Sequence, residues 1–170
     1  ITREEQDAFA LESQRRACRA IDAGRFRAEI LPVAVPQRKR DPIVVDTDEH
    51  PRIQKTESGF ELATSLGSLA KLRPAFRRDG TVTAGNASSI NDGAAALLVC
   101  SEEFARANGL AVRARIDGAG TGAVEPNEVM MAPVTAVGRL LERTGTSIGD
   151  YDLCEVNEAF AAQAVAVTRE

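Results

Sequence analysis

The sequence predicts an α/β fold in which helices cover mixed sheets. Hydrophobic residues make up 44% of the chain, whereas aromatic residues make up only 4% and Trp is absent. A core of Ala, Val, Leu and Ile suits a helix-covered sheet better than a small aromatic-rich β module. In the second half, short apolar runs alternate with capped helical patterns, which is typical of such sheets. At 170 residues, the chain has room for one domain or for parts of two.

Charge and cysteine content narrow the possible functions. The net charge is −4, with 21 basic and 25 acidic residues, so we expect no nucleic-acid partner. No apolar run reaches the roughly 20 residues of a membrane helix, and we expect neither a membrane span nor a signal peptide. Cys18, Cys100 and Cys154 form no CxxC pair, and His50 is the only His. We therefore expect no disulfide framework, no metal site and a reducing, cytoplasmic location.

Helical signals open the chain. Thr2 and Glu5 have the spacing of a capping box, which predicts a helix over residues 3–23, and Gly24 supplies a left-handed stop. The following patterns predict a strand at 28–35 weakened by Pro32, a basic loop at 37–41, a short strand at 43–46, a polar irregular excursion at 47–65, a short helix at 66–72 and a turn at 79–80. This irregular half is typical of an inserted subdomain.

The second half predicts alternating strands and helices. The expected strands are residues 94–100, 111–116 and 152–156. Ser101 caps the first helix, which Gly109 ends. Pro133 opens a second helix that Gly145 closes, and residues 157–168 form a third, Ala-rich helix. A glycine-rich stretch at 118–122 is expected to be flexible.

Two segments concentrate groups that could act on a ligand. Residues 80–96, GTVTAGNASSINDGAAA, place Asn86, Ser88, Asn91 and Asp92 beside a backbone thin enough for close approach. A plain polar turn before a buried strand explains the same pattern. Residues 155–163, EVNEAFAAQ, put Asn157 at the end of an expected strand, where α/β sheets place their sites. Its amide could hold a water or an oxyanion, or it could merely cap the helix.

Together, the two segments resemble signatures of the thiolase family, in the family's order. The flanking stretches ITREEQDAFALESQRRA, GRFRAEILPV, VDTDEHPR and LAKLRPAFRRDG are also similar to thiolase sequence. The resemblance weakens at residues 53–65, and residues 129–132, VMMA, depart from a Met-Gly segment that many thiolases carry. The resemblance implies the thiolase fold, with two similar α/β halves and an inserted loop domain. It divides the chain into a coenzyme-covering loop subdomain (1–76), the end of the N-terminal half (77–117) and the start of the C-terminal half (118–170).

The resemblance also implies the site. Asn157 matches the family's Asn that holds a catalytic water and forms part of the oxyanion hole. Glu158 is interpreted as structural, orienting the loop. The residues that match the wall around the pantetheine arm of coenzyme A are Ser88, Ala84, Ala87, Phe76, Ala159 and Phe160.

Thiolases transfer an acyl group to a Cys thiolate, with a His that activates it and a second Cys as acid and base. The resemblance places that nucleophile before Ile1, and the His and second Cys after Glu170. None of the chain's own cysteines fits these roles, and each is expected to pack inertly. Because the sequence starts at Ile1 rather than Met and stops inside a helical pattern, we expect both ends to be cut. We therefore expect the 170-residue chain alone to be inactive.

The resemblance implies an acyltransferase acting in lipid metabolism, such as fatty acid β-oxidation. Its substrates would be coenzyme A and acyl-CoA, with no permanently bound cofactor, and its assembly a homodimer or homotetramer. Two alternatives stay open. One is a related condensing enzyme of the ketoacyl synthase class, which the NEAFAAQ stretch disfavours. The other is a non-catalytic acyl-CoA-binding or assembly fragment.

Overall fold

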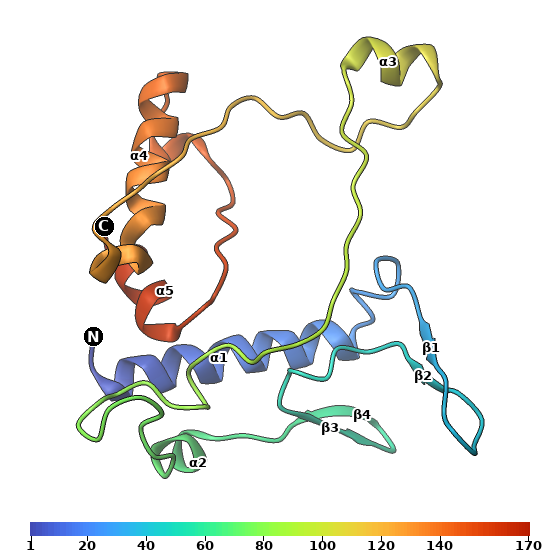
Figure 1. Ribbon diagram of the computed structural model, residues 1–170, viewed down its shortest axis with the longest axis vertical. Helices are drawn as coiled ribbons and strands as arrows, with labels where there is room; N and C mark the ends of the chain where they lie inside the picture. The colour runs from blue at the N-terminus through green and yellow to red at the C-terminus, as the bar shows by residue number, and fades with distance from the viewer. The chain divides into compact units, whose positions relative to one another are not determined.

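Helix α1 (Arg3–Asp22) is the central element of the first part of the chain. In the computed structural model, which describes all 170 residues, Thr2 and Glu5 form the predicted capping box. Gly24 ends this region with φ +67, as predicted. The chain divides into two units, residues 1–89 with 157–169, and residues 90–156 with 170. In the first unit α1 packs against α5, β4 and α2, so it is the scaffold on which the other elements rest (Figure 1).

Two antiparallel hairpins follow α1. Strand β1 (Val33–Val35) pairs with β2 (Ile43–Val45), and β3 (Ile53–Thr56) pairs with β4 (Gly59–Leu62). The predicted strand at 28–35 is shortened because its first residues turn, with the Ile30 N–H bonded to the Phe26 carbonyl at 3.0 Å. The expected irregular excursion at 47–65 is wrong in part, since it contains the second hairpin. That hairpin is fixed to α1 by the Phe60 N–H, which donates to Asp22 Oδ1 at 3.0 Å.

Short elements complete the first unit. Helix α2 (Leu66–Ala70) begins at a capping Ser65, close to the predicted helix, and the predicted turn before Gly80 forms. Helix α5 (Ala161–Val167) starts four residues later than predicted. The buried apolar side chains of this unit come from α1, α2 and α5: Ala10, Leu11, Cys18, Leu69, Ala161 and Ala164.

The second unit contains helices but none of the predicted strands. Helices α3 (Glu102–Ala107) and α4 (Ala132–Thr144) form where their caps predict them, with the short 3-10 turns η1 (Pro126–Met131) and η2 (Ile148–Asp150) beside α4 in the sequence. Residues 94–100, 111–116 and 152–156 pair with no other strand, and Figure 1 shows the first two as single extended ribbons. Their apolar side chains, including Leu97, Val112 and Leu153, are exposed. A strand needs a neighbour for its backbone hydrogen bonds, and these 170 residues supply none there.

The glycine-rich stretch at 118–122 packs against α4. Arg139 Nη1 donates to the Thr121 carbonyl at 2.9 Å, and Arg143 Nη1 donates to the Ala119 carbonyl at 3.0 Å. A Cβ on Gly120 would lie 2.5 Å from the Ala136 carbonyl oxygen. The glycines therefore allow this stretch of main chain to lie close to α4, whereas the sequence was interpreted as a flexible stretch.

An ion pair joins the start of α1 to the end of α5. Arg169 Nη2 lies 2.5 Å from Glu5 Oε1, and the Thr2 N–H donates to Glu5 Oε2 at 2.6 Å. The bond from Arg169 has the larger effect and that from Thr2 adds to it, and together they lower the pKa of Glu5 from 4.5 to about 2. A carboxyl whose pKa is lowered by folding stabilises the fold above its unfolded pKa, and this contribution is lost as the pH falls from 4.5 towards 2.

We expect Glu5→Gln to reduce the pH dependence of stability in that acid window. Denaturant unfolding at a series of pH values measures it. The matched control is Glu4→Gln, at an exposed position with no ion pair, which should retain the wild-type dependence. If Glu5→Gln and Glu4→Gln behave alike, the role given to the Glu5–Arg169 pair is wrong.

Candidate functional site

The two segments singled out in the sequence lie side by side. We name residues 86–89 the NASS segment and residues 157–160 the NEAF segment. The Ser88 N–H donates to the Ala159 carbonyl at 3.0 Å, and the Ala161 N–H donates to the Asn86 carbonyl at 2.9 Å. Ala87 and Phe160 thereby form an isolated antiparallel bridge. Segments about 70 positions apart in the chain are thus joined through their backbones.

Asn86 holds the NASS segment to α1 inside a buried polar network. The residue is 3% exposed, and its Nδ2 donates to Asp7 Oδ1 at 2.9 Å and to the Thr81 carbonyl at 3.1 Å. Its Oδ1 accepts the Thr83 N–H at 2.8 Å. Arg3 Nε completes the network by donating to Asp7 Oδ2 at 2.8 Å. The Asn86 side chain therefore makes its hydrogen bonds within the fold and is not available to bind a ligand.

Gly85 allows the same loop to lie on α2. A Cβ at this position would come within 2.5 Å of Leu69 Cδ2 and 2.6 Å of Leu72 Cδ1. The glycine backbone that was expected to lie close to a ligand lies close to two leucine side chains instead.

We expect Gly85→Ala to lower the thermal midpoint by several degrees, because the added methyl group would clash with both leucines and Leu69 is buried with no room to move. Gly93→Ala, which meets nothing within 4 Å, is the control; equal midpoints for the two variants would contradict this packing.

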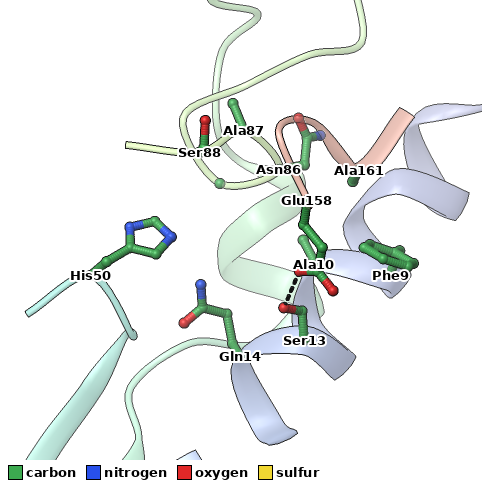
Figure 2. A pocket seen from close by; sticks show the side chains of 11 residues that line it. Phe9, Ala10, Ser13, Gln14, His50, Asn86, Ala87, Ser88, Glu158 and Ala161 are labelled. Atoms are coloured by element: carbon green, nitrogen blue, oxygen red, sulfur yellow. Dashed lines mark hydrogen bonds between the residues drawn. The ribbon is translucent and has the colours of Figure 1, made fainter. Parts of the chain in front are cut away.

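A small polar pocket lies between α1 and the two segments (Figure 2). Ser13 Oγ donates to Glu158 Oε2 at 2.5 Å, which links α1 to the NEAF segment. On the opposite wall His50 Nδ1 lies 2.5 Å from Ser89 Oγ. The remaining lining residues are Phe9, Ala10, Gln14, Gly85, Asn86, Ala87, Ser88 and Ala161. The pocket holds one carboxylate and the chain's one imidazole.

Asn157 does not cap α5. The helix begins at Ala161 with Phe160 as its N-cap residue, so the capping alternative is wrong. The Asn157 carbonyl accepts the Ala159 N–H at 3.0 Å, which makes a tight turn at the start of the NEAF segment. The Asn157 side chain is exposed and makes no hydrogen bond within the chain. Its amide is therefore available to a ligand.

The other predicted site residues surround this turn. Phe160 packs edge to face with Phe76, with ring centroids 6.2 Å apart and planes at 71°. Phe76 is nevertheless 74% exposed. Ala84 and Ser88 are exposed, and the Ala84 carbonyl accepts from Arg52 Nη2 at 2.7 Å. Ala87 and Ala159 are half-buried. All seven predicted residues belong to the first unit.

The sequence did not identify the α1 residues that support the site. Asp7 and Ser13 contact Asn86 and Glu158 across more than 75 positions of the chain. Their only local signal is that Arg3 and Asp7 stand four residues apart, the spacing of a helical ion pair. Such a pair is usually a solvated one, and nothing in the sequence marks it as buried.

The cysteines differ in exposure. Cys18 is buried in α1, and its thiol contacts the Phe60 carbonyl at 3.5 Å. Cys100 and Cys154 are exposed, so their expected packing inside strands is wrong in this structure, for the same lack of strand partners. No group of three His, Cys, Asp or Glu side chains could hold a metal ion, and no helix is both long and apolar enough to cross a membrane.

Comparison with known families identifies the family to which the chain belongs. The N-terminal domain family of thiolase matches residues 1–103, and the C-terminal domain family of thiolase matches residues 110–170. The chain therefore belongs to the thiolase family, and its fold is part of the thiolase fold. The thiolase family and the α/β fold class that the sequence predicted are confirmed.

Among known proteins, the chain is 54% identical over its 170 residues to an acetyl-CoA acetyltransferase of Pseudomonas aeruginosa. It is 50% identical to a probable acetyl-CoA acyltransferase of Staphylococcus aureus. The structure matches a Bacillus anthracis acetyl-CoA acetyltransferase with a TM-score of 0.89 at 44% identity, and human mitochondrial 3-ketoacyl-CoA thiolase with a TM-score of 0.87 at 41% identity, each over 99% of this chain. The chain spans about 41% of the length of these curated relatives and 40% of these structures.

Proposed function

We propose that this chain forms the coenzyme-facing part of a thiolase that transfers acyl groups between coenzyme A and an active-site Cys. The term "full-length thiolase" is used below for a protein that contains this chain and the remaining length of its relatives. The observation that carries the proposal is the bridge between the NASS and NEAF segments. It brings the residues expected to line the pantetheine arm next to the residue expected to stabilise the thioester oxygen.

In this proposal, Asn157 acts on the reacting carbonyl. Its side chain has no partner within the chain, so the amide N–H can donate to a water or to the oxyanion that forms when a thioester is attacked. A donor fixed before the reaction stabilises that charge without reorganising, which is worth roughly 3 kcal/mol. The tight turn and the backbone bonds to the NASS segment fix the main chain beside it.

The remaining site residues form a narrow wall for the pantetheine arm. Ala84, Ala87 and Ala159 present little more than backbone, and the Phe76–Phe160 pair presents an aromatic edge. The Ser88 hydroxyl is exposed beside them and can bond the arm's amides. Coenzyme A and acyl-CoA are thus substrates, and the proposal requires no permanently bound cofactor.

A direct test compares the full-length thiolase with this chain alone. Acetoacetyl-CoA and coenzyme A are supplied, and acetyl-CoA is measured. We expect turnover from the full-length thiolase and none from the chain, because Cys18 is buried, and Cys100 and Cys154 belong to a different unit from the NASS and NEAF segments. Turnover by neither protein, together with coenzyme A binding by both, would favour the acyl-CoA-binding alternative. Condensation only with acyl-carrier substrates would favour the ketoacyl synthase class.

Ser88→Ala in the full-length thiolase is expected to raise KM for coenzyme A by about 3- to 10-fold, with kcat changed less than about twofold. One lost hydrogen bond to the substrate weakens binding by about 0.5–1.5 kcal/mol. Steady-state kinetics at varied coenzyme A concentrations measures this change. A loss confined to kcat would place Ser88 at the reacting end instead of beside the arm.

Further features remain proposals of the same kind. They are the division at residues 76 and 117, the homodimer or homotetramer, the cytoplasmic location and the role in fatty acid β-oxidation. Size-exclusion chromatography with light scattering on the full-length thiolase tests the assembly.

A further inference from the structure

The NEAF segment has one side chain that reaches back to α1. Glu158 follows Asn157 directly, and its Oε2 accepts a hydrogen bond from Ser13 Oγ at 2.5 Å (Figure 2). This distance is in the range of a charge-assisted bond between a hydroxyl and a carboxylate. No other hydrogen bond or ion pair holds the Glu158 side chain, so Ser13 alone sets its direction.

Backbone bonds hold the main chain after Asn157, but no hydrogen bond holds the Asn157 side chain. The residue before Asn157, Val156, belongs to the other unit. The backbone bonds of the NEAF segment begin at Ala159, which bonds the Asn157 carbonyl, and continue with Ser88. Between Asn157 and Ala159 only one side-chain hydrogen bond restrains the chain, and that bond joins Glu158 to Ser13.

We propose that Ser13 and Glu158 form a positioning pair that orients Asn157 towards the thioester oxygen. The inference rests on the proposed oxyanion role of Asn157. Glu158 touches no reacting atom in this account; it acts by fixing the turn that carries Asn157. Misplacing a catalytic group by about 1 Å can cost about 100-fold in rate, so a single side-chain anchor is enough to control turnover.

The pair contributes little to the packing of the unit. Glu158 is exposed and Ser13 half-buried, whereas the contact between α1 and α5 is made by buried apolar residues such as Ala10, Ala161 and Ala164. Loss of the pair should therefore change the direction of Asn157 without unfolding the segment. This separates a positioning role from a merely structural one.

The test uses the full-length thiolase with Ser13→Ala, Glu158→Ala and the double variant. We expect each single variant to lower kcat about 10-fold, with KM for coenzyme A changed less than about twofold. The double variant should be no slower than the slower single variant, because both changes break the same bond. Glu158→Gln should retain kcat within about threefold, since its amide oxygen still accepts from Ser13.

Ser58→Ala is the matched control. Its hydroxyl is exposed in the β3–β4 turn, where its Oγ lies 3.1 Å from Thr56 Oγ1. It should retain the wild-type kcat and KM. Thermal midpoints of all variants are measured alongside the kinetics.

The outcomes distinguish this inference from the proposed function. If Asn157→Ala slows the enzyme but Ser13→Ala and Glu158→Ala do not, the positioning pair is wrong and the oxyanion role stands. Additive losses in the double variant, or parallel falls in kcat, coenzyme A affinity and thermal midpoint, would also overturn it. A full-length thiolase without thiolysis activity would contradict both proposals together.

Discussion

Replacing Asn157 with Ala in the full-length thiolase is expected to lower kcat about 100-fold while KM for coenzyme A changes less than about twofold. Removing one oxyanion donor in other enzymes costs about 100- to 1000-fold in kcat. The loss falls on kcat because the donor bonds the developing charge much more strongly than the ground-state thioester. Steady-state thiolysis of acetoacetyl-CoA at varied coenzyme A concentrations measures both quantities.

The control for this variant is Asn127→Ala, another exposed Asn with no hydrogen bond from its side chain. It should leave kcat and KM unchanged. Equal losses of turnover and coenzyme A affinity in Asn157→Ala would indicate that Asn157 binds the substrate uniformly. Wild-type turnover would show that the reaction does not use its amide.

Replacing Asn86 with Ala is expected to lower the free energy of unfolding by about 2–4 kcal/mol. The Asn86 side chain bonds three groups within a buried network, including one oxygen of the Asp7 carboxylate at 2.9 Å. Its removal leaves the Thr83 N–H without an acceptor and withdraws a donor from a carboxylate that is only 4% exposed as a residue. An unmet buried polar group costs more than the bond itself contributes.

Denaturant unfolding of the full-length thiolase measures the loss, with Asn127→Ala as the control, expected within about 0.5 kcal/mol of wild type. Because the network also holds the NASS segment, KM for coenzyme A should rise in Asn86→Ala. A stability within 0.5 kcal/mol of wild type would mean that water replaces the Asn86 amide, and the network would then be less important than its burial indicates.

Helices were predictable from this sequence because their signals are local. The capping box at Thr2 and Glu5, the Ser101 cap and the Gly145 stop each lie within one turn of the element that they define. Residues 94–100 carry an equally clear apolar pattern, yet they form no strand. A strand depends on a partner from elsewhere in the protein, and periodicity cannot show whether that partner is present.

The candidate site was predictable only where its signals are local in the sequence. The small and polar residues of the NASS and NEAF segments singled them out, the family resemblance linked them, and the structure places them side by side. The sequence could not identify Ser13 or Asp7 as site residues, because a polar residue on a helix is expected to face solvent until its distant partner is known. Asn157 also illustrates the limit: the sequence allowed a helix cap or a ligand group, and only the observed start of α5 at Ala161 excludes the cap.

The most direct test of this account is a crystal structure of the full-length thiolase with a coenzyme A thioester bound. We predict that the pantetheine arm runs along the bridged NASS and NEAF segments, with the thioester oxygen about 3 Å from the Asn157 amide or from a water that it holds. The same structure should show Glu158 still bonded to Ser13. A thioester bound away from this turn, with the Asn157 side chain facing solvent, would contradict the account.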